Sequence, residues 1–185
     1  MQRPNGASAS VQNSPDLVQV SVVIATRNET SNIVACIDSV RWAAEILVAD
    51  DGSDDDTREL ARSAGATIVD TSGSATIGAS RNMAIAQASN HWILVVDADE
   101  RGSSDLAVAV REVIARPSSA AYRVPRRNYF LGREVRHGGW QPTRPVRLFD
   151  SALRYDDSKV HEHVITSGEP ATLAASLLHY PYASL

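Results

Sequence analysis

The stretch WILVVDADER, Trp92 to Arg101, decides the expected fold. Its first five residues are apolar and mostly β-branched, which predicts a strand buried on both faces. Asp97-Ala98-Asp99 follows directly, so two carboxylates stand at the carboxyl end of this strand. At positions i and i+2 of an extended segment they point to one side, which suits Mg²⁺ or Mn²⁺ bridging to a phosphate. Aspartates are also common turn residues, and this stretch alone leaves both interpretations open.

Strand and helix patterns alternate upstream of this stretch. Short apolar runs at residues 20–25, 45–49 and 66–69 predict three strands, and helical spacing is seen at 33–44, 54–64 and 78–88. Such alternation predicts an α/β fold: an open, mostly parallel sheet with helices on both faces. Cys36 falls on the apolar side of the first helix, with Thr30 or Ser31 as its cap, and is expected in the core. Residues 1–17 are polar and predicted to be a disordered leader, so the domain is expected to begin at Val18.

Three polar segments follow three of these strands: Thr26 to Glu29, Asp50 to Ser53, and Asp97 to Asp99. Ligands of open α/β sheets bind outside the carboxyl ends of the strands, where these segments converge. The convergence favours the metal site over the simple turn. Neither G-x-G-x-x-G nor G-x-x-x-x-G-K-[ST] follows the first strand, which argues against a dinucleotide-dependent oxidoreductase and a P-loop NTPase.

Composition narrows the class further. With 185 residues, 43% hydrophobic and 22% charged, the chain has the size and balance of one globular domain. Its net charge of -4 argues against nucleic acid as a partner. The single cysteine excludes an internal disulfide, and with no apolar run of membrane-spanning length a cytoplasmic location is expected.

Arginines crowd the second half of the chain. This density favours an anionic saccharide, a phosphorylated lipid head group or a nearby membrane surface, so peripheral contact with the inner face of the plasma membrane is expected. Ordinary solvent-exposed arginines are the alternative. The arginines are Arg123, Arg126, Arg127, Arg133, Arg136, Arg144 and Arg147, with only Glu134 as an acidic residue between Arg123 and Arg147.

Several of these motifs resemble a known family. SVVIATRNE, VADDGSDDDT, GASRN and VVDADER are similar to family 2 glycosyltransferases of the GT-A fold. YRVPRRNYFLGREVRHGGW, VRLFD, KVHEHV and LLHYPY resemble, more narrowly, the subgroup that contains the lipopolysaccharide core glucosyltransferase WaaE. The resemblance covers about residues 20 to 185. It implies metal-dependent, inverting transfer of a hexose from a nucleoside-diphosphate sugar such as UDP-glucose, with Mg²⁺ or Mn²⁺ as cofactor. The acceptor would be a saccharide or glycolipid in cell-envelope polysaccharide or lipopolysaccharide synthesis.

The resemblance also implies a donor site made by the strand ends. Thr26 and Glu29 would surround the nucleoside, and Asp50, assisted by Asp51, would recognise the base or ribose. Arg81, at a helix start, would lie near the diphosphate, since a guanidinium and exposed N–H groups both suit phosphate oxygens. A solvent-facing helix residue is the alternative for Arg81.

The same resemblance implies that different residues bind the metal and act as the base. Asp97 would lie near the ribose or reach the metal through water, and Asp99 would ligate the metal, which helps the nucleoside diphosphate to leave. Inverting transfer also needs a carboxylate to deprotonate the acceptor. Glu162 is the first choice, with His161 near the metal. In an extended segment Glu162 points away from His161 and His163, so the three cannot share one role; a surface glutamate is the alternative.

The acceptor side is expected downstream of a packing helix at about residues 103–116, in a small β-rich region. Arg126 is a candidate for substrate binding, and Trp140 for stacking on a sugar or for the core. Relatives commonly read WYPD where this chain has Trp140-Gln141-Pro142-Thr143. If that aspartate is the family base, Thr143 argues against turnover. The weaker candidates for a base are Asp150, Asp156 and Asp157.

These inferences predict a single domain at residues 18–185. Residues 18–102 would form the nucleotide-sugar and metal half, and 103–185 the acceptor half, which ends earlier than in relatives and is expected to be truncated. A non-catalytic nucleotide-sugar binding or scaffolding domain is the alternative. A sugar nucleotidyltransferase is disfavoured because ATRNE lacks its Gly-rich, basic signature. The donor sugar, the acceptor and the oligomeric state stay open.

Overall fold

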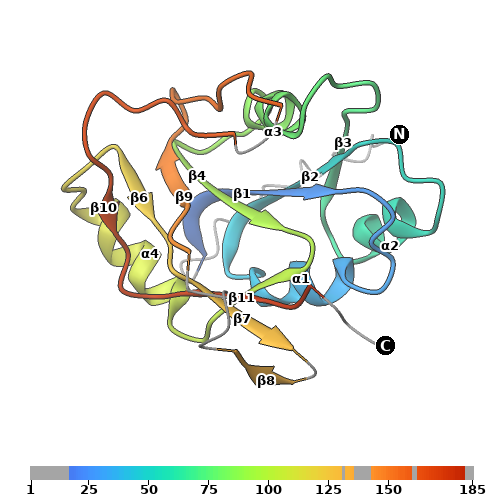
Figure 1. The fold of residues 1–185 in the computed structure, drawn as a ribbon, viewed down its shortest axis with the longest axis horizontal. Coiled ribbons are helices and arrows are strands. Elements are labelled where there is room, and N and C mark those ends of the chain that lie inside the picture. Colours follow the sequence, from blue (N-terminus) through green and yellow to red (C-terminus); the bar gives the residue numbers. More distant parts are fainter. Residues whose placement is uncertain (1–16, 131, 136–142, 160–161, 182–185) are drawn as a thin grey trace, which may run out of the picture.

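A computed structural model describes residues 17–130, 132–135, 143–159 and 162–181 of the chain. Within these ranges the strands form two sheets (Figure 1). The larger sheet has seven strands in the order β10-β6-β9-β4-β1-β2-β3, and the smaller has four in the order β5-β11-β7-β8.

The first half of the chain builds the parallel part of the large sheet. Its strands are β1 (Val18–Thr26), β2 (Ala43–Asp50), β3 (Thr67–Asp70) and β4 (Trp92–Asp97), joined by α1 (Ile33–Ser39), α2 (Thr57–Ser63) and α3 (Ile77–Ile85). The four strands run parallel, with Thr26 opposite Asp50 and Ala25 opposite Asp97. The polar strand ends therefore meet at one edge, as the sequence predicted.

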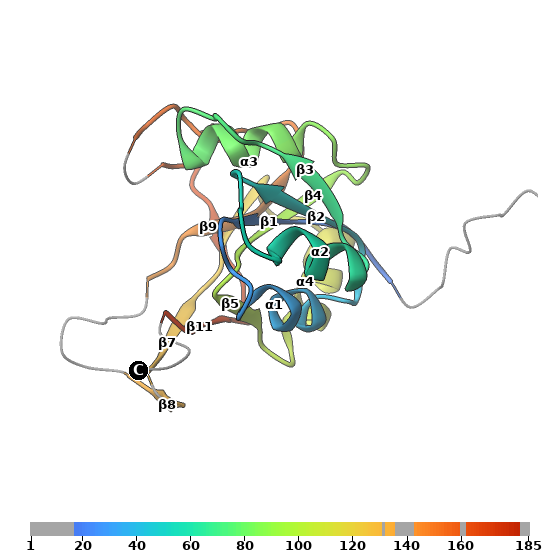
Figure 2. The ribbon, with the colours of Figure 1, turned by 90° about the vertical axis from the view of Figure 1, so that its right-hand side faces the viewer.

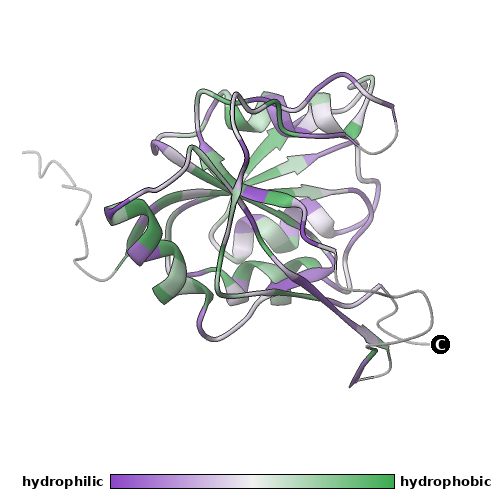
Figure 3. Ribbon diagram, turned by 60° about the vertical axis from the view of Figure 1, so that its left-hand side comes forward, coloured by the Kyte–Doolittle hydropathy of each residue, from purple (hydrophilic) through white to green (hydrophobic). Residues whose placement is uncertain are grey.

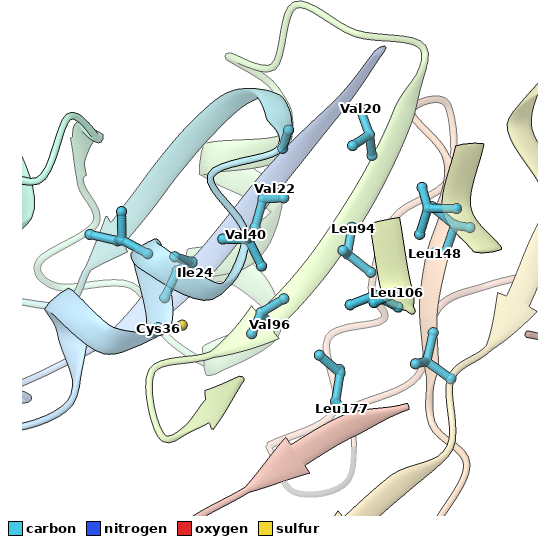
Figure 4. Close-up of a cluster of buried hydrophobic side chains, with 14 of the residues drawn as sticks. Val20, Val22, Ile24, Cys36, Val40, Leu94, Val96, Leu106, Leu148 and Leu177 are labelled. Carbon is cyan, nitrogen blue, oxygen red and sulfur yellow. The ribbon is translucent and has the colours of Figure 1, made fainter. Parts of the chain in front are cut away.

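Two cores lie on opposite faces of this sheet. Figure 2 shows α3 on one face and α1, α2 and α4 on the other. Alternate residues of β1 serve the two cores, as period-2 strand geometry requires: Val22 and Ile24 face α1, and Val23 faces α3. Cys36 lies fully buried near Ile24 and Val96, which confirms the prediction that it is a core residue (Figure 4). The central strands are largely hydrophobic (Figure 3), because both of their faces are covered.

The second half of the chain completes both sheets. The elements are β5 (Glu100–Gly102), α4 (Leu106–Ala115), β6 (Ala121–Arg123), β7 (Arg126–Phe130), β8 (Arg133–Glu134), β9 (Val146–Asp150), β10 (Ala171–Thr172) and β11 (Leu177–His179). Strand β9 pairs antiparallel with β4, and β11 lies between β5 and β7. The chain therefore returns to β4 through β9, and to β5, which follows β4, through β11.

Several predicted boundaries were wrong. Helix α1 ends at Ser39, and Ala44 lies in β2. The apolar residues at 43–44 are part of this strand and do not form a further turn of the helix. The residue that precedes α1 is Asn32, not Thr30 or Ser31. Strand β4 ends at Asp97, and Ala98-Asp99 forms a turn before β5. The two aspartates are thus not on one extended segment, and their side chains need not point the same way.

Candidate active site

Two pockets adjoin at Asp97, which lines both of them. The smaller has a volume of about 370 Å³ and lies at the carboxyl ends of β1, β2 and β4, beside the first turn of α3. Its lining is Ala25, Thr26, Arg27, Glu29, Asp51, Ile77, Ser80, Asp97, Ala98, Asp99 and His179. We call it the strand-end pocket. It brings together five of the residues predicted for the donor site.

The loops after β1 and β2 are tied to each other at this pocket. Asn28 has a positive φ of 54°, a conformation that asparagine tolerates better than most residues. Its backbone N–H donates to Ser53 Oγ, and its side-chain oxygen accepts from the N–H of Asp54. The Glu29 N–H donates to Thr57 Oγ1 at the start of α2. The two loops therefore hold a fixed rim for the pocket.

The neighbours Asp50 and Asp51 have opposite environments. Asp50 is fully buried, and its carboxylate accepts hydrogen bonds from the N–H groups of Gly52 and Ser53, from Ser53 Oγ and from Arg58 Nε. Asp51 lines the strand-end pocket and is partly exposed. Asp50 thus holds the turn after β2, while Asp51 is the carboxylate of this pair that faces the pocket.

Asp99 meets a histidine that the sequence reasoning had not singled out. His179, in β11, has Nε2 at 3.1 Å from Asp99 Oδ2 and Nδ1 at 2.8 Å from Asn128 Oδ1. The Asn128 contact orients the imidazole ring so that Nε2 faces the Asp99 carboxylate. Carboxylate oxygens and imidazole nitrogens are both common metal ligands, and here the two lie side by side. A metal-binding histidine usually has its second ring nitrogen hydrogen-bonded to another protein group, as Nδ1 of His179 is to Asn128. His179 and Asp99 are therefore suitable ligands for a metal ion.

Asp97 has a different setting from Asp99. Its carboxylate accepts from Arg81 Nη2 at 2.5 Å and from the Arg147 guanidinium, and these arginine side chains are only 4% and 6% exposed. Burial raises the pKa of Asp97, but the two guanidinium groups outweigh this effect and hold it well below its usual range. Asp97 is therefore a poor proton acceptor, with its oxygens already engaged by two cations.

Glu100 extends this ion-pair network into the core. The side chain is fully buried and accepts from the N–H of Asp97 at 3.0 Å. Arg147 Nη2 lies 3.4 Å and Arg126 Nη1 3.7 Å from its carboxylate. Burial raises the pKa of Glu100, and Arg147 only partly opposes that rise.

Arg81 connects Asp97 to the predicted base. Its Nη1 contacts Glu162 Oε1, while Nη2 contacts Asp97, so a single guanidinium holds both carboxylates. The Glu162 side chain is 16% exposed and lines the larger pocket. Gly78 lets the start of α3 pack closely against the segment at residues 155–156, because a Cβ there would lie 2.9 Å from the Asp156 carbonyl oxygen and 3.3 Å from Tyr155 Cβ. Glu162 therefore lies close to the boundary between the two pockets.

The larger pocket has a volume of about 690 Å³ and is rich in arginine. Its lining is Arg81, Asp97, Arg123, Arg126, Thr143, Arg144, Pro145, Val146, Arg147, Tyr155, Glu162, His163, Val164, Thr166, Glu169 and Pro170. We call it the arginine pocket. Four of the crowded arginines, Arg126 among them, meet here with Arg81 and the predicted base Glu162, whereas Arg127 pairs with Glu134 away from it.

Other predicted residues lie elsewhere. Trp140 and His161 are outside the described residues. Asp150 contacts His91, and Asp156 contacts His163; these aspartates and Asp157 line neither pocket. Within the described ranges, no group of three or more His, Cys, Asp or Glu side chains could hold a metal. A metal at Asp99 and His179 would therefore need further ligands from a substrate or water.

Solved structures with the same architecture define the class of fold. S. aureus TarS in complex with UDP-GlcNAc aligns with a TM-score of 0.64 at 15% identity, covering 91% of this chain and 60% of TarS. Mannosyl-3-phosphoglycerate synthase from Rubrobacter xylanophilus aligns with a TM-score of 0.52 at 26% identity, covering 60% of this chain and 41% of the synthase. The α/β, GT-A prediction is thus confirmed.

Sequence comparison gives the family. The family model described as Glycosyl transferase family 2 matches residues 21–167, so the chain belongs to glycosyl transferase family 2. LpsC of Rhizobium meliloti, a lipopolysaccharide core biosynthesis glycosyltransferase, is 33% identical over 173 residues, which cover 87% of this chain and 63% of LpsC. A TPR repeat-containing protein of Synechococcus elongatus is 35% identical over 134 residues, which cover 72% of this chain and 32% of that protein. The chain thus spans less than two thirds of the length of either relative.

One further observation concerns membranes. In the described part of the chain, no helix is both long and apolar enough to cross a bilayer.

Proposed function

We propose that this chain transfers a hexose, with inversion, from a nucleoside-diphosphate sugar in the strand-end pocket to a saccharide or glycolipid acceptor in the arginine pocket. The observation that carries the proposal is the pairing of Asp99 with His179 at the carboxyl end of β4, beside Thr26, Glu29 and Asp51. Support for a UDP-hexose donor comes from TarS, whose structure holds UDP-GlcNAc. Support for an envelope saccharide as acceptor comes from LpsC.

Mg²⁺ or Mn²⁺ is the proposed cofactor, held by Asp99 and His179. When bound, the cation supplies positive charge for the departing nucleoside diphosphate. The glucosyl-3-phosphoglycerate synthase of Mycobacterium tuberculosis, which aligns with a TM-score of 0.50 at 21% identity and covers 68% of this chain and 50% of its own, was crystallised with Mn²⁺ and UDP-glucose. Asp97 has a separate role in our proposal: it fixes Arg81 and Arg147 beside the reaction site instead of ligating metal.

The strand-end residues bind and orient the donor. Thr26 Oγ1 is buried without a hydrogen-bond partner in the described structure, so it is free to bond a nucleoside oxygen. Asp51 is the better placed of the two neighbouring aspartates for base or ribose recognition. Arg81 lines the arginine pocket and contacts Asp97, which lines both pockets, and it stays our candidate for the diphosphate end of the donor.

Glu162 is the proposed base. The Arg81 guanidinium contacts both Glu162 and Asp97, so Glu162 lies near the boundary between the pockets, where the acceptor hydroxyl would meet the donor. Contact with Arg81 holds the Glu162 carboxylate at this boundary. To act, Glu162 must exchange part of its contact with Arg81 for the acceptor hydroxyl.

Metal-dependent donor binding tests the donor half of the proposal. We expect UDP to bind more tightly with Mn²⁺ present, and Asp99→Asn and His179→Gln each to weaken that binding about 10- to 100-fold. Asp38→Asn on the exposed face of α1 is the matched control and should bind as the wild type does. Unchanged Mn²⁺-dependent binding in Asp99→Asn would exclude Asp99 as a ligand.

Turnover with a panel of donors, UDP-glucose among them, tests the acceptor half. Glu162→Gln should keep UDP binding but lose about 10²- to 10⁴-fold in transfer or hydrolysis, the usual contribution of a general base. A specific observation favours a second candidate function, a non-catalytic nucleotide-sugar binding domain. Thr143 lines the arginine pocket, at the position where the family resemblance implies an aspartate. UDP binding by the wild type without turnover on any donor would establish that second function.

A further inference from the structure

Unsatisfied donors are concentrated in the wall of the arginine pocket. Five buried side-chain polar atoms lack a hydrogen-bond partner in the described structure, and four of them belong to residues that line this pocket. These four are the Nε atoms of Arg81, Arg126 and Arg147 and the Tyr155 hydroxyl. All four can donate a hydrogen bond. Buried polar groups in proteins are nearly always paired, so a cluster of free donors in one pocket points to a ligand that accepts.

The guanidinium groups are held firmly while their Nε atoms stay free. Arg81 and Arg147 use their terminal nitrogens on Asp97, Glu162 and Glu100. The Arg81 guanidinium also lies 5.1 Å from the centre of the Tyr155 ring, which is itself buried. This is a built site and not a set of mobile surface arginines.

Charge in the pocket favours an anion. Five arginines line it, against the carboxylates of Asp97, Glu162 and Glu169 and that of the buried Glu100 behind Arg126 and Arg147, so the arginines are still in excess. These carboxylates already have arginine partners: Asp97 and Glu162 as described above, and Glu169 with Arg123 at 2.8 Å. A ligand with negatively charged oxygens would satisfy both the excess charge and the free donors, because charge-assisted bonds from guanidinium groups to oxyanions are strong and directional.

We infer that the arginine pocket binds an oxyanion, a phosphate or carboxylate group, that the acceptor carries. This inference rests on the proposed function, because it names the chemical class of the acceptor for the same site. It explains why this wall of the site is built from arginine, whose guanidinium group matches the geometry of phosphate and carboxylate.

Calorimetric titration with small sugars is the test. Glucose 6-phosphate, glucuronate and glucose are titrated into the full chain, once alone and once with Mn²⁺ and saturating UDP. We expect at least one anionic sugar to bind at least tenfold more tightly than glucose, with UDP bound as well as without it. The tighter of the two anionic sugars identifies phosphate or carboxylate as the group recognised.

Two variants locate the binding. Tyr155→Phe removes a hydroxyl that bonds nothing in the described protein, so a purely structural role predicts no change in binding, whereas our inference predicts a loss of about 3- to 10-fold. Arg126→Gln should lose about tenfold or more. Arg62→Gln, on the exposed side of α2, is the control and should bind as the wild type does.

The inference fails if both anionic sugars bind no better than glucose, or if Tyr155→Phe and Arg126→Gln bind as the wild type does. It also fails if UDP competes with the anionic sugars, because the oxyanion would then occupy the donor site. UDP binding is a separate readout: its absence counts against the proposed function, and the titrations without UDP still decide whether the arginine pocket binds an oxyanion.

Discussion

Replacing Asp97 by asparagine should destabilise the fold, although the residue belongs to a D-x-D motif. Its carboxylate is shared by Arg81 and Arg147, whose side chains are 4% and 6% exposed. Removing one partner of a buried ion pair costs about 3–5 kcal/mol, because a charge is left buried and uncompensated. Each arginine keeps one other carboxylate, Arg81 at Glu162 and Arg147 at Glu100, so we expect the lower end, about 3 kcal/mol.

Thermal unfolding followed by circular dichroism measures this loss. For a chain of this size about 3 kcal/mol lowers Tm by roughly 6–12 °C. Asp99→Asn is the matched comparison: its main contact is His179, and a loss of about 1 kcal/mol or less is expected. If Asp97→Asn melts within about 2 °C of the wild type, or if both variants melt equally low, the separation of a structural from a metal-binding aspartate is wrong.

The same comparison has a predicted pH dependence. The pKa of Asp97 is lowered in the folded state from its usual 3.8, since the effect of Arg147 and Arg81 exceeds that of burial. A lowered pKa means that the stabilisation is fully present above about pH 4 and is lost as the pH falls through the folded-state pKa. The difference in Tm between wild type and Asp97→Asn should therefore shrink below pH 4. A difference that grows on acidification would contradict the ion-pair assignment.

Three shorter predictions concern other residues. Gly78→Ala should lower stability by about 1–3 kcal/mol in urea unfolding, because the added Cβ meets the Asp156 carbonyl oxygen; Gly73→Ala meets nothing within 4 Å and has only the cost of its positive φ, which Gly78 lacks, so it should lose only about 1 kcal/mol. Asp50→Asn should destabilise the fold by about 2 kcal/mol, while the fraction that still folds binds UDP with the wild-type affinity. Asp51→Asn should keep the wild-type Tm but bind UDP more weakly, and the reverse pattern would exchange the two roles. The Cys36 thiol, whose pKa burial raises, should react with a disulfide reagent only on unfolding, and prompt labelling of the native chain would contradict its burial.

Local patterns were sufficient for the architecture. Strands β1 to β4 and helices α1 to α4 occupy the regions that apolar periodicity had marked, and parallel connection brought their polar ends together. These features depend on residues a few positions apart, which is why they can be read along the chain. The errors were at boundaries such as Ser39, after which apolar residues belong to the next strand although their spacing continues that of the helix.

The two adjacent aspartates of the second strand end show a limit of motif reading. The sequence makes Asp50 and Asp51 equivalent acidic residues after a strand. Their difference arises from the sheet, because Asp50 is still in register opposite Thr26 and Asp70 and turns inward to the backbone of its own turn. Only Asp51 reaches the pocket.

By itself, then, the sequence determined the α/β sheet, the edge at which a ligand would bind and the residues Thr26, Glu29 and Asp99 that line the strand-end pocket. Tertiary structure alone decided the partners of Asp97 and Asp99. Arg147 lies 50 positions from Asp97, and His179 lies 80 positions from Asp99. They arrive because β9 pairs with β4 and because β11 enters between β5 and β7. No local period encodes such contacts, since strand pairing between distant segments sets them and gives the two carboxylates of one motif different partners.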